Sequence, residues 1–201
     1  MHNLGLPLPP REKEEERKDL KIYLDPEEIE RVISCCSSFR DKLIVRLLWR
    51  TGLRILELLS LRIEDIDFDN ATLKVELLKQ RGRERRIIPI DRESLRMLER
   101  YLCGRTQGKV FGIGVRRVQQ IINQVGKVAG IEAVGDMNQG RAWKLHPHTF
   151  RHSFAIHWIK ILGAERIVEL QRHLGHRKLE TTSRYLKFSP QALHDCYDKL
   201  W

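Results

Sequence analysis

Six of the eight histidines fall within 31 consecutive residues near the end of the chain: His146, His148, His152, His157, His173 and His176. Arg151, Arg172 and Arg177 lie among them, each next to a histidine or one helical turn from one. Arginine offers a planar pair of donors that matches phosphate oxygens, and histidine can donate or relay protons. The segment holds no cysteine and no HExxH pattern. The pattern therefore favours phosphate chemistry over a metal site, and no metal ion or other cofactor is expected. On composition alone, the alternative that this segment is a basic helical surface without a functional site stays open.

The charge of the chain indicates an anionic partner. The 201 residues carry 37 Lys and Arg against 27 Asp and Glu, a net charge of +10, and residues 140–187 hold ten Lys and Arg against three Glu. Localised positive charge of this kind is typical of proteins that bind nucleic acid. The chain has no apolar run long enough to span a bilayer and no signal peptide at its start, and its four cysteines show no CxxC spacing. We expect a cytoplasmic, nucleoid-associated protein without a membrane segment.

The elements that must position these residues are mostly helices. Residues 1–21 are expected to form a flexible, charged tail, residues 22–188 one folded domain, and residues 189–201 a terminal helix. Apolar periodicity and cap residues predict a mainly α domain with a small three-stranded antiparallel sheet, an α+β fold. Helices are expected over 26–36, 39–50, 55–61, 92–103, 115–129, 149–162, 164–173, 179–186 and 190–200. Strands are expected over 66–68, 72–78 and 86–90, and a loop over 130–143.

Four motifs occur in a fixed order along this predicted domain. TGLRILEL at 51–58 places Arg54 just after a glycine helix stop, HTFRH at 148–152 opens a helix, LGH follows at 174–176, and Tyr185 lies nine residues beyond His176. Together they resemble the tyrosine recombinase (phage integrase) family, which includes the Xer-type recombinases. The resemblance covers about residues 22–188 and implies the catalytic-domain fold of that family.

The resemblance implies a site-specific recombinase or integrase that cuts and rejoins DNA without metal or ATP. Tyr185 would attack the scissile phosphate and leave a covalent 3′-phosphotyrosine, and the surrounding positive charge should help the phenol to lose its proton. Arg54 and Arg151 would hold the non-bridging oxygens. His148 would transfer a proton at the tyrosine, and His176 would hydrogen-bond the phosphate.

Further residues of the expected site are less uniform in how they match the family. Glu57, one turn after Arg54, should orient the site from behind it. The family places a lysine, the general acid for the leaving oxygen, on the second-to-third strand hairpin. An ungapped alignment puts Arg81 there, and Lys79 is the only lysine between the two strands. We assign the role to Lys79 because arginine is a poor proton donor, and Arg81 stays open. The basic residues expected to contact DNA are Arg81, Arg83, Arg85, Arg177, Lys178 and Arg184.

The expected partner is double-stranded DNA, with self-association into a tetramer on DNA and a monomer possible for the domain alone. The terminal helix of residues 189–201 is a candidate for docking on a neighbouring protomer. His146, His152 and His157 are interpreted as structural, and His173 is left open. The first 21 residues cannot form the core-binding domain that such recombinases usually carry, so we expect weak, salt-sensitive DNA affinity. The alternatives are a type IB topoisomerase-like enzyme and a non-catalytic DNA-binding regulatory relative.

Overall fold

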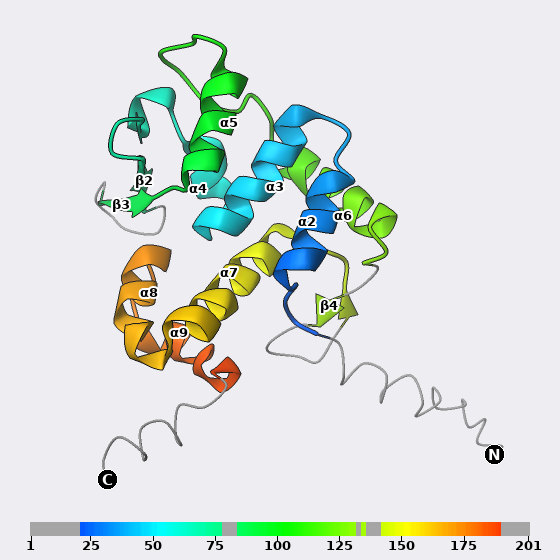
Figure 1. The fold of residues 1–201 in the computed structure, drawn as a ribbon, viewed down its shortest axis with the longest axis vertical. Helices are drawn as coiled ribbons and strands as arrows, with labels where there is room; N and C mark the ends of the chain where they lie inside the picture. Colours follow the sequence, from blue (N-terminus) through cyan, green and yellow to red (C-terminus); the bar gives the residue numbers. More distant parts are fainter. Residues whose placement is uncertain (1–20, 78–83, 132–133, 136–141, 190–201) are drawn as a thin grey trace, which may run out of the picture.

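The structure is a computed structural model that describes residues 21–77, 84–131, 134–135 and 142–189. It is mainly helical with a small antiparallel sheet (Figure 1), which confirms the predicted fold class. The helices are α2 (Pro26–Ser34), α3 (Phe39–Thr51), α4 (Ile55–Ser60), α5 (Arg92–Leu102), α6 (Val115–Val128), α7 (Pro147–Leu162), α8 (Ile167–Leu174) and α9 (Leu179–Ser183). The strands are β1 (Ile66–Asp67), β2 (Thr72–Glu76), β3 (Arg85–Pro89), β4 (Val134–Gly135) and β5 (Ala142–Trp143), and single 3₁₀ turns form η1 (Ile63–Asp65), η2 (Ala164–Arg166) and η3 (Leu186–Phe188).

Helix α3 forms the centre of the main core and delivers the chain to the site. Leu43 and Leu47 have no exposed surface, because the apolar run of α3 packs against α5 on one side and α7 on another. The helix stops at Gly52, whose φ of 61° lies in the left-handed region. A Cβ atom at this position would lie 2.6 Å from a ring carbon of Phe154 on α7, so glycine fits both the turn and the close approach. This stop turns the chain so that Arg54 lies directly in front of α4.

The three-stranded sheet follows the alternation expected of a strand pair with one buried face. Strands β1, β2 and β3 are neighbours in that order and all antiparallel, with Leu73 opposite Ile88. Leu73, Val75 and Ile88 are buried, and the residues between Leu73 and Val75 and on either side of Ile88 are exposed. The backbone N–H of Leu77 donates to the carbonyl of Glu84 at 2.9 Å, which extends the pairing beyond β2.

Three predicted segments differ in detail from the structure. The segment expected to be a loop over 130–143 contains β4 and β5, which pair with each other over two residues each. The helix expected over 164–173 is divided into η2 and α8, and the one expected over 179–186 into α9 and η3. Strands of two residues are too short to produce an alternation, and a single tight turn within a helical pattern does not disturb it, so neither detail has a sequence signal.

A second, smaller core lies between the last helices. It consists of Ala155, Ile156 and Ile159 of α7, Leu170 and Leu174 of α8, and Tyr185. The start of the domain closes it from one side, because the ring of Tyr23 packs edge-on against Phe188 of η3 with centroids 5.6 Å apart. The predicted nucleophile therefore lies inside a packed core that joins the first described residues to the last.

The structure describes only the inner ends of the predicted tail and of the predicted terminal helix. Lys21, the last residue of the expected tail, donates to a carboxylate oxygen of Glu28 at 2.8 Å and also pairs with Asp25. Residues 1–20 and 190–201 lie outside the described residues, so the tail and the terminal helix stay predictions. Over the described ranges, no helix is both long and apolar enough to cross a membrane.

Candidate active site

Arg54 is fixed by the helix that follows it. It occupies the N-cap position of α4, and its backbone N–H donates to Oε2 of Glu57 at 2.9 Å. One guanidinium nitrogen, Nη1, donates to Oε1 of the same carboxylate at 2.9 Å. The side chain of Glu57 has no exposed surface, whereas that of Arg54 keeps 25% of its own. A buried carboxylate thus holds a guanidinium that still reaches solvent.

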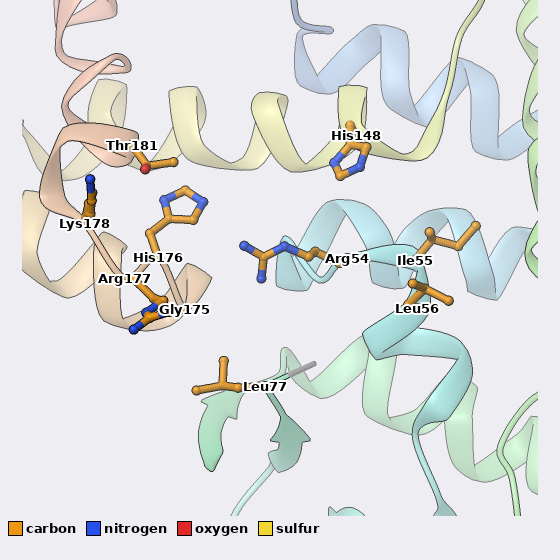
Figure 2. Close-up of a pocket in the computed structure, with 10 residues that line it drawn as sticks. All are labelled: Arg54, Ile55, Leu56, Leu77, His148, Gly175, His176, Arg177, Lys178 and Thr181. Carbon is orange, nitrogen blue, oxygen red and sulfur yellow. The ribbon is translucent and has the colours of Figure 1, made fainter. Parts of the chain in front are cut away.

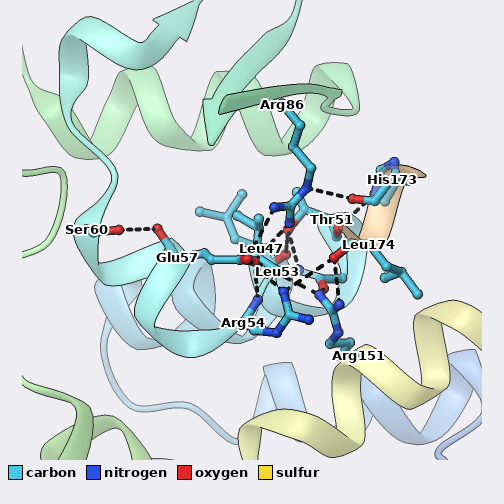
Figure 3. A network of polar contacts seen from close by, with 11 residues as sticks. Leu47, Thr51, Leu53, Arg54, Glu57, Ser60, Arg86, Arg151, His173 and Leu174 are labelled. Atoms are coloured by element: carbon cyan, nitrogen blue, oxygen red, sulfur yellow. Dashed lines mark hydrogen bonds and ion pairs between the residues drawn. The ribbon is translucent and has the colours of Figure 1, made fainter. Parts of the chain in front are cut away.

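Arg151 is brought to the same place by α7. Its two terminal nitrogens donate to backbone carbonyls, Nη1 to Gly52 at 2.6 Å and Nη2 to Leu174 at 2.7 Å. Arg54 Nη1 lies 3.5 Å from the same Leu174 carbonyl. The last carbonyls of a helix have no intrahelical partner and carry its negative end, which suits cations at the end of α8. The structure therefore brings the two arginines together, as Figure 3 shows.

A third arginine completes this cluster, and the sequence analysis did not single it out. Arg86 on β3 bonds both oxygens of Glu57, at 3.2 and 2.9 Å, and its Nε donates to the His173 carbonyl at 2.8 Å. A signal was present: Arg86 is two residues from Ile88 and therefore shares the inward face of an alternating strand. A cation on that face requires a buried anion, which here is Glu57.

Glu57 balances the three arginines. Besides Arg54 and Arg86, it lies 4.0 Å from Arg151 Nη1. Burial opposes its ionisation, but the hydrogen bonds and charges of Arg86 and Arg54 outweigh burial and lower the pKa of Glu57. Burial and the nearby Arg54 lower the pKa of Arg151 to about 9, so the side chain keeps its charge at neutral pH. The cluster consists of three cations around one buried carboxylate, an arrangement that leaves excess positive charge at the surface side.

An open pocket of about 960 Å³ lies in front of this cluster. It is lined by Arg54, Ile55 and Leu56, by Leu77 after β2, by His148 on α7, and by Gly175, His176, Arg177, Lys178 and Thr181 around the start of α9. In Figure 2 the Arg54 guanidinium points toward His176, and His148 lies across the pocket on α7. The charged side chains of this lining are all cationic. The pocket therefore suits an anionic group, and a phosphodiester is the expected one.

His176 is held as a neutral ring at the edge of the pocket. Its Nδ1 lies 2.9 Å from the Thr182 hydroxyl, and the residue follows Gly175, whose φ of 66° ends α8. Burial first, and then the charges of Arg151 and Arg54, lower the pKa of His176 to about 3. At neutral pH the ring can therefore donate one hydrogen bond and accept one, but carries no charge.

Tyr185, the predicted nucleophile, is buried, with 2% of its surface accessible. Its hydroxyl lies 2.8 Å from Nδ1 of His152, a residue that the sequence analysis interpreted as structural. Burial raises the pKa of Tyr185 and outweighs the opposing charges of Arg151 and Arg184. The nearby positive charge therefore favours loss of the phenolic proton, as expected, but in this structure the loss of hydration acts more strongly.

Of the remaining predicted residues, some line the pocket and others do not. Arg177 and Lys178 line the pocket, and Arg184 is exposed on the turn before Tyr185. Arg85 faces away from the pocket lining and lies 3.8 Å from Asp65, with 47% of its side chain exposed. The predicted hairpin residues Lys79, Arg81 and Arg83 lie outside the described residues.

His173, which the sequence left open, connects α8 to the end of α3. Its Nε2 lies 2.9 Å from the Thr51 carbonyl, and its ring stacks on Phe154 at 4.8 Å. Burial lowers its pKa. His173 therefore has a structural role beside the cluster. Within the part of the chain that the structure describes, no group of three or more His, Cys, Asp or Glu side chains is arranged to hold a metal ion.

The fold and the arrangement of these side chains define a tyrosine recombinase catalytic domain. The chain belongs to the phage integrase family, whose family model matches residues 23–191. It is 34% identical to the tyrosine recombinase XerA of Saccharolobus solfataricus over 184 residues, which cover 91% of this chain and 57% of the relative. XerA of Pyrococcus horikoshii is 32% identical over 193 residues, covering 90% of this chain and 62% of the relative. The chain thus spans about three fifths of the length of these relatives.

Solved structures support the same assignment. A crystal structure of a XerA recombinase superposes with a TM-score of 0.68 and 27% identity, over 90% of this chain and 64% of that one. The catalytic domain of bacteriophage HP1 integrase superposes with a TM-score of 0.66 and 26% identity, over 90% of this chain and 95% of that one. The nearly complete coverage of the HP1 domain indicates that the present fold corresponds to a catalytic domain.

Proposed function

We propose that this chain is the catalytic domain of a site-specific recombinase that cuts and rejoins double-stranded DNA through a covalent 3′-phosphotyrosine. The observation that carries the proposal is the convergence of Arg54 and Arg151 on one carbonyl group, beside a cationic pocket. Two guanidiniums a few ångströms apart are suited to the charge that develops on a phosphate during displacement. Tyr185 belongs to the same end of the domain and supplies the oxygen nucleophile.

The proposed reaction assigns one step to each group. The Tyr185 oxygen forms a bond to phosphorus, the bond from phosphorus to the 5′-oxygen breaks, and that oxygen takes a proton. Arg54 and Arg151 stabilise the non-bridging oxygens; a guanidinium has five N–H donors, so donors remain beyond those bonded to backbone. His176 hydrogen-bonds the phosphate, and His148 takes the phenolic proton. The reverse sequence of steps rejoins the strand.

The proton for the leaving oxygen comes, in this proposal, from the β2–β3 hairpin. Lys79 is the only lysine of the segment that connects the two strands, and an ammonium group is a far better acid than a guanidinium. Arg81, at the position that the family alignment indicates, is the alternative, and it predicts slow expulsion of the 5′-oxygen. Glu57 acts behind the site by holding Arg54, as its two hydrogen bonds to that residue suggest.

The proposed partner is duplex DNA, in the cytoplasm at the nucleoid. XerH, which shares the fold at 22% identity and a TM-score of 0.69, was solved on a palindromic difH substrate in a post-cleavage complex. A tetramer on two duplexes, and a monomer in the absence of DNA, are part of the proposal, with residues 189–201 docking on a neighbouring protomer.

DNA binding should depend on salt and on the cations at the rim of the pocket. We expect the logarithm of the affinity for a mixed-sequence duplex to fall linearly with the logarithm of salt between about 50 and 200 mM, because phosphate contacts release counterions. Replacing Arg177 and Lys178 together by alanine should reduce the slope by about 2. Fluorescence anisotropy measures this slope.

The matched control removes the same charge elsewhere. Arg92 and Arg96 are exposed on α5 and do not line the pocket. Their replacement by alanine should leave the slope within experimental error of the wild-type value. Equal changes in the two double variants would mean that binding reflects net charge rather than this pocket.

Covalent capture followed by two assays tests the proposed function. Nicked duplexes with a randomised centre are incubated with the protein, and the DNA that stays attached after denaturation is sequenced; the nick releases the 5′-hydroxyl fragment and prevents rejoining. The recovered site is then placed on one plasmid twice, and once in a plain supercoiled plasmid. A recombinase exchanges the paired sites. Relaxation of both plasmids without exchange would indicate a topoisomerase-like enzyme, and binding without covalent capture a regulatory relative.

A further inference from the structure

Tyr185 is buried, with 2% of its surface accessible, and is not among the residues that line the pocket. His148 of α7 lines the pocket, whereas Arg151 of the same helix, like Tyr185, does not. The hydroxyl of Tyr185 lies 2.8 Å from Nδ1 of His152, which is four residues after His148 on α7. Four residues of an α-helix correspond to a rise of about 6 Å. His152 therefore binds the hydroxyl from the helical turn that follows the turn of His148.

The surroundings of Tyr185 explain why this position is stable. Its ring packs among Ala155, Ile156 and Leu170 of the second core, which removes the apolar part of the side chain from water. The hydroxyl leaves water as well, and a buried hydroxyl without a partner is costly. His152 supplies that partner, and it is itself largely buried, so the bond is shielded from solvent.

The charge state of His152 suits it to accept the phenolic proton in a hydrogen bond. Burial first, and then the neighbouring rings of His148 and His146 and the charges of Arg151 and Arg184, lower the pKa of His152 to about 4. The ring is therefore neutral at physiological pH, with one nitrogen free to accept. A neutral phenol and a neutral imidazole form a hydrogen bond of ordinary strength, which can be broken when the tyrosine side chain moves.

We propose that His152 is a positioning residue that holds the Tyr185 hydroxyl in a buried position, from which the side chain must be released before it reaches a phosphate in the pocket. The inference rests on the proposed function for the role of Tyr185 as nucleophile, but the hydrogen bond and the burial are properties of the protein alone. Tyr185 lies on a short turn between α9 and η3, and its backbone N–H is bonded only locally, to Thr182 at 3.0 Å. Release therefore requires the movement of a short segment rather than of a long helix.

Two variants separate a hydrogen bond from simple packing. His152→Leu replaces the imidazole with an apolar side chain of similar bulk. The change removes the acceptor and leaves the Tyr185 hydroxyl buried without a partner. His152→Asn places an amide oxygen close to the position of Nδ1 and can restore the bond. If His152 holds the tyrosine, the first variant should expose Tyr185 and the second should not.

Nitration of tyrosine by tetranitromethane, read by peptide mass spectrometry, tests the proposal without DNA. We expect Tyr185 to react between about 5-fold and 100-fold faster in His152→Leu than in the wild type, the factor that corresponds to stranding a buried hydroxyl. His152→Asn should react at nearly the wild-type rate. Tyr101, which packs on Phe111 away from this core, is the internal reference. An unchanged rate in His152→Leu, or equal increases in both variants, would overturn the proposal.

A second measurement covers the case in which His152→Leu does not fold. Imidazole ¹⁵N NMR of the wild type and of Tyr185→Phe reads the bond in proteins that keep His152. Loss of the hydroxyl should shift the Nδ1 resonance of His152 and leave that of His176, which faces Thr182, in place. An unshifted His152 resonance would contradict the proposal. Since neither experiment contains DNA, a negative result here is distinct from a failure of the proposed recombinase activity.

Discussion

Glu57→Gln is expected to lower the free energy of unfolding by about 3 to 5 kcal/mol, the range found when one partner of a buried ion pair is removed. Glutamine has nearly the same shape as glutamate, so the change removes charge rather than volume. Arg86 would lose both of its bonds to a carboxylate, and Arg54 would lose its ion pair. The amide nitrogen of glutamine would also face guanidinium groups that cannot accept a hydrogen bond. Urea unfolding followed by circular dichroism measures the effect.

A surface pair provides the matched control for Glu57→Gln. Glu64 lies 3.0 Å from Arg62, but both side chains are exposed. Exposed pairs of this kind contribute little to stability, so Glu64→Gln should unfold at the same urea concentration as the wild type. A Glu57→Gln variant that unfolded together with this control would mean that the carboxylate does not hold the arginine cluster.

The stability difference between the wild type and Glu57→Gln should depend on pH. Because the pKa of Glu57 is lowered in the folded protein, its ionised form stabilises the fold. This contribution is fully present above the ordinary glutamate pKa of about 4.3 and is lost as the pH falls through the lower value of the folded state. The stability difference between wild type and Glu57→Gln should therefore stay constant from pH 7 down to about pH 5 and narrow below about pH 4.

Arg151→Lys is expected to reduce the rate of DNA cleavage by about 100- to 1,000-fold, the usual cost of removing one donor to a developing oxyanion. The guanidinium of Arg151 is planar and is fixed by the carbonyls of Gly52 and Leu174, which direct its remaining donors. A lysine keeps the charge but is a point donor, which cannot span both carbonyls and also bind a phosphate. Single-turnover cleavage of a captured nicked duplex measures the rate.

The control for Arg151→Lys is the same substitution at an exposed position. Arg166 has 59% of its side chain exposed and pairs with Glu169 on the neighbouring turn. Arg166→Lys should cleave at the wild-type rate, and both variants should bind the duplex with similar affinity. If Arg151→Lys cleaved as fast as Arg166→Lys, charge alone would be sufficient at position 151.

The sequence predicted the helical framework well where local signals are strong. Asp25 followed by Pro26 begins α2, and Gly52 ends α3, each through backbone chemistry that is local to the residue. The alternation of Leu73 and Val75 likewise identified β2. Elements that depend on a distant partner had no such signal. Strand β4 exists because β5 lies beside it, and two residues carry no period.

The residues of the site show the same difference between local signals and contacts with distant residues. Arg54 and Arg151 were predicted from motif order, and the structure brings them to one carbonyl. Arg86 was not predicted as a site residue, because the sequence shows the density of charge but not the buried carboxylate across from it. His152 was interpreted as structural because its contact with Tyr185 joins residues 33 positions apart. Spacing along a helix gives the face of a residue, but the partner on that face depends on the packing of another helix.

The proposed function requires the cations around Arg54 and Arg151 to bind one scissile phosphate within reach of a single phenolic oxygen. The most direct measurement is the chemical identity of the covalent complex. Wild type and Tyr185→Phe are incubated with the captured nicked duplex, and the attached nucleotide is located by protease digestion and mass spectrometry. The account predicts a 3′-phosphonucleotide on the peptide that contains Tyr185 and no covalent complex with Tyr185→Phe. A complex that forms with Tyr185→Phe, or a nucleotide attached to a different tyrosine, would contradict it.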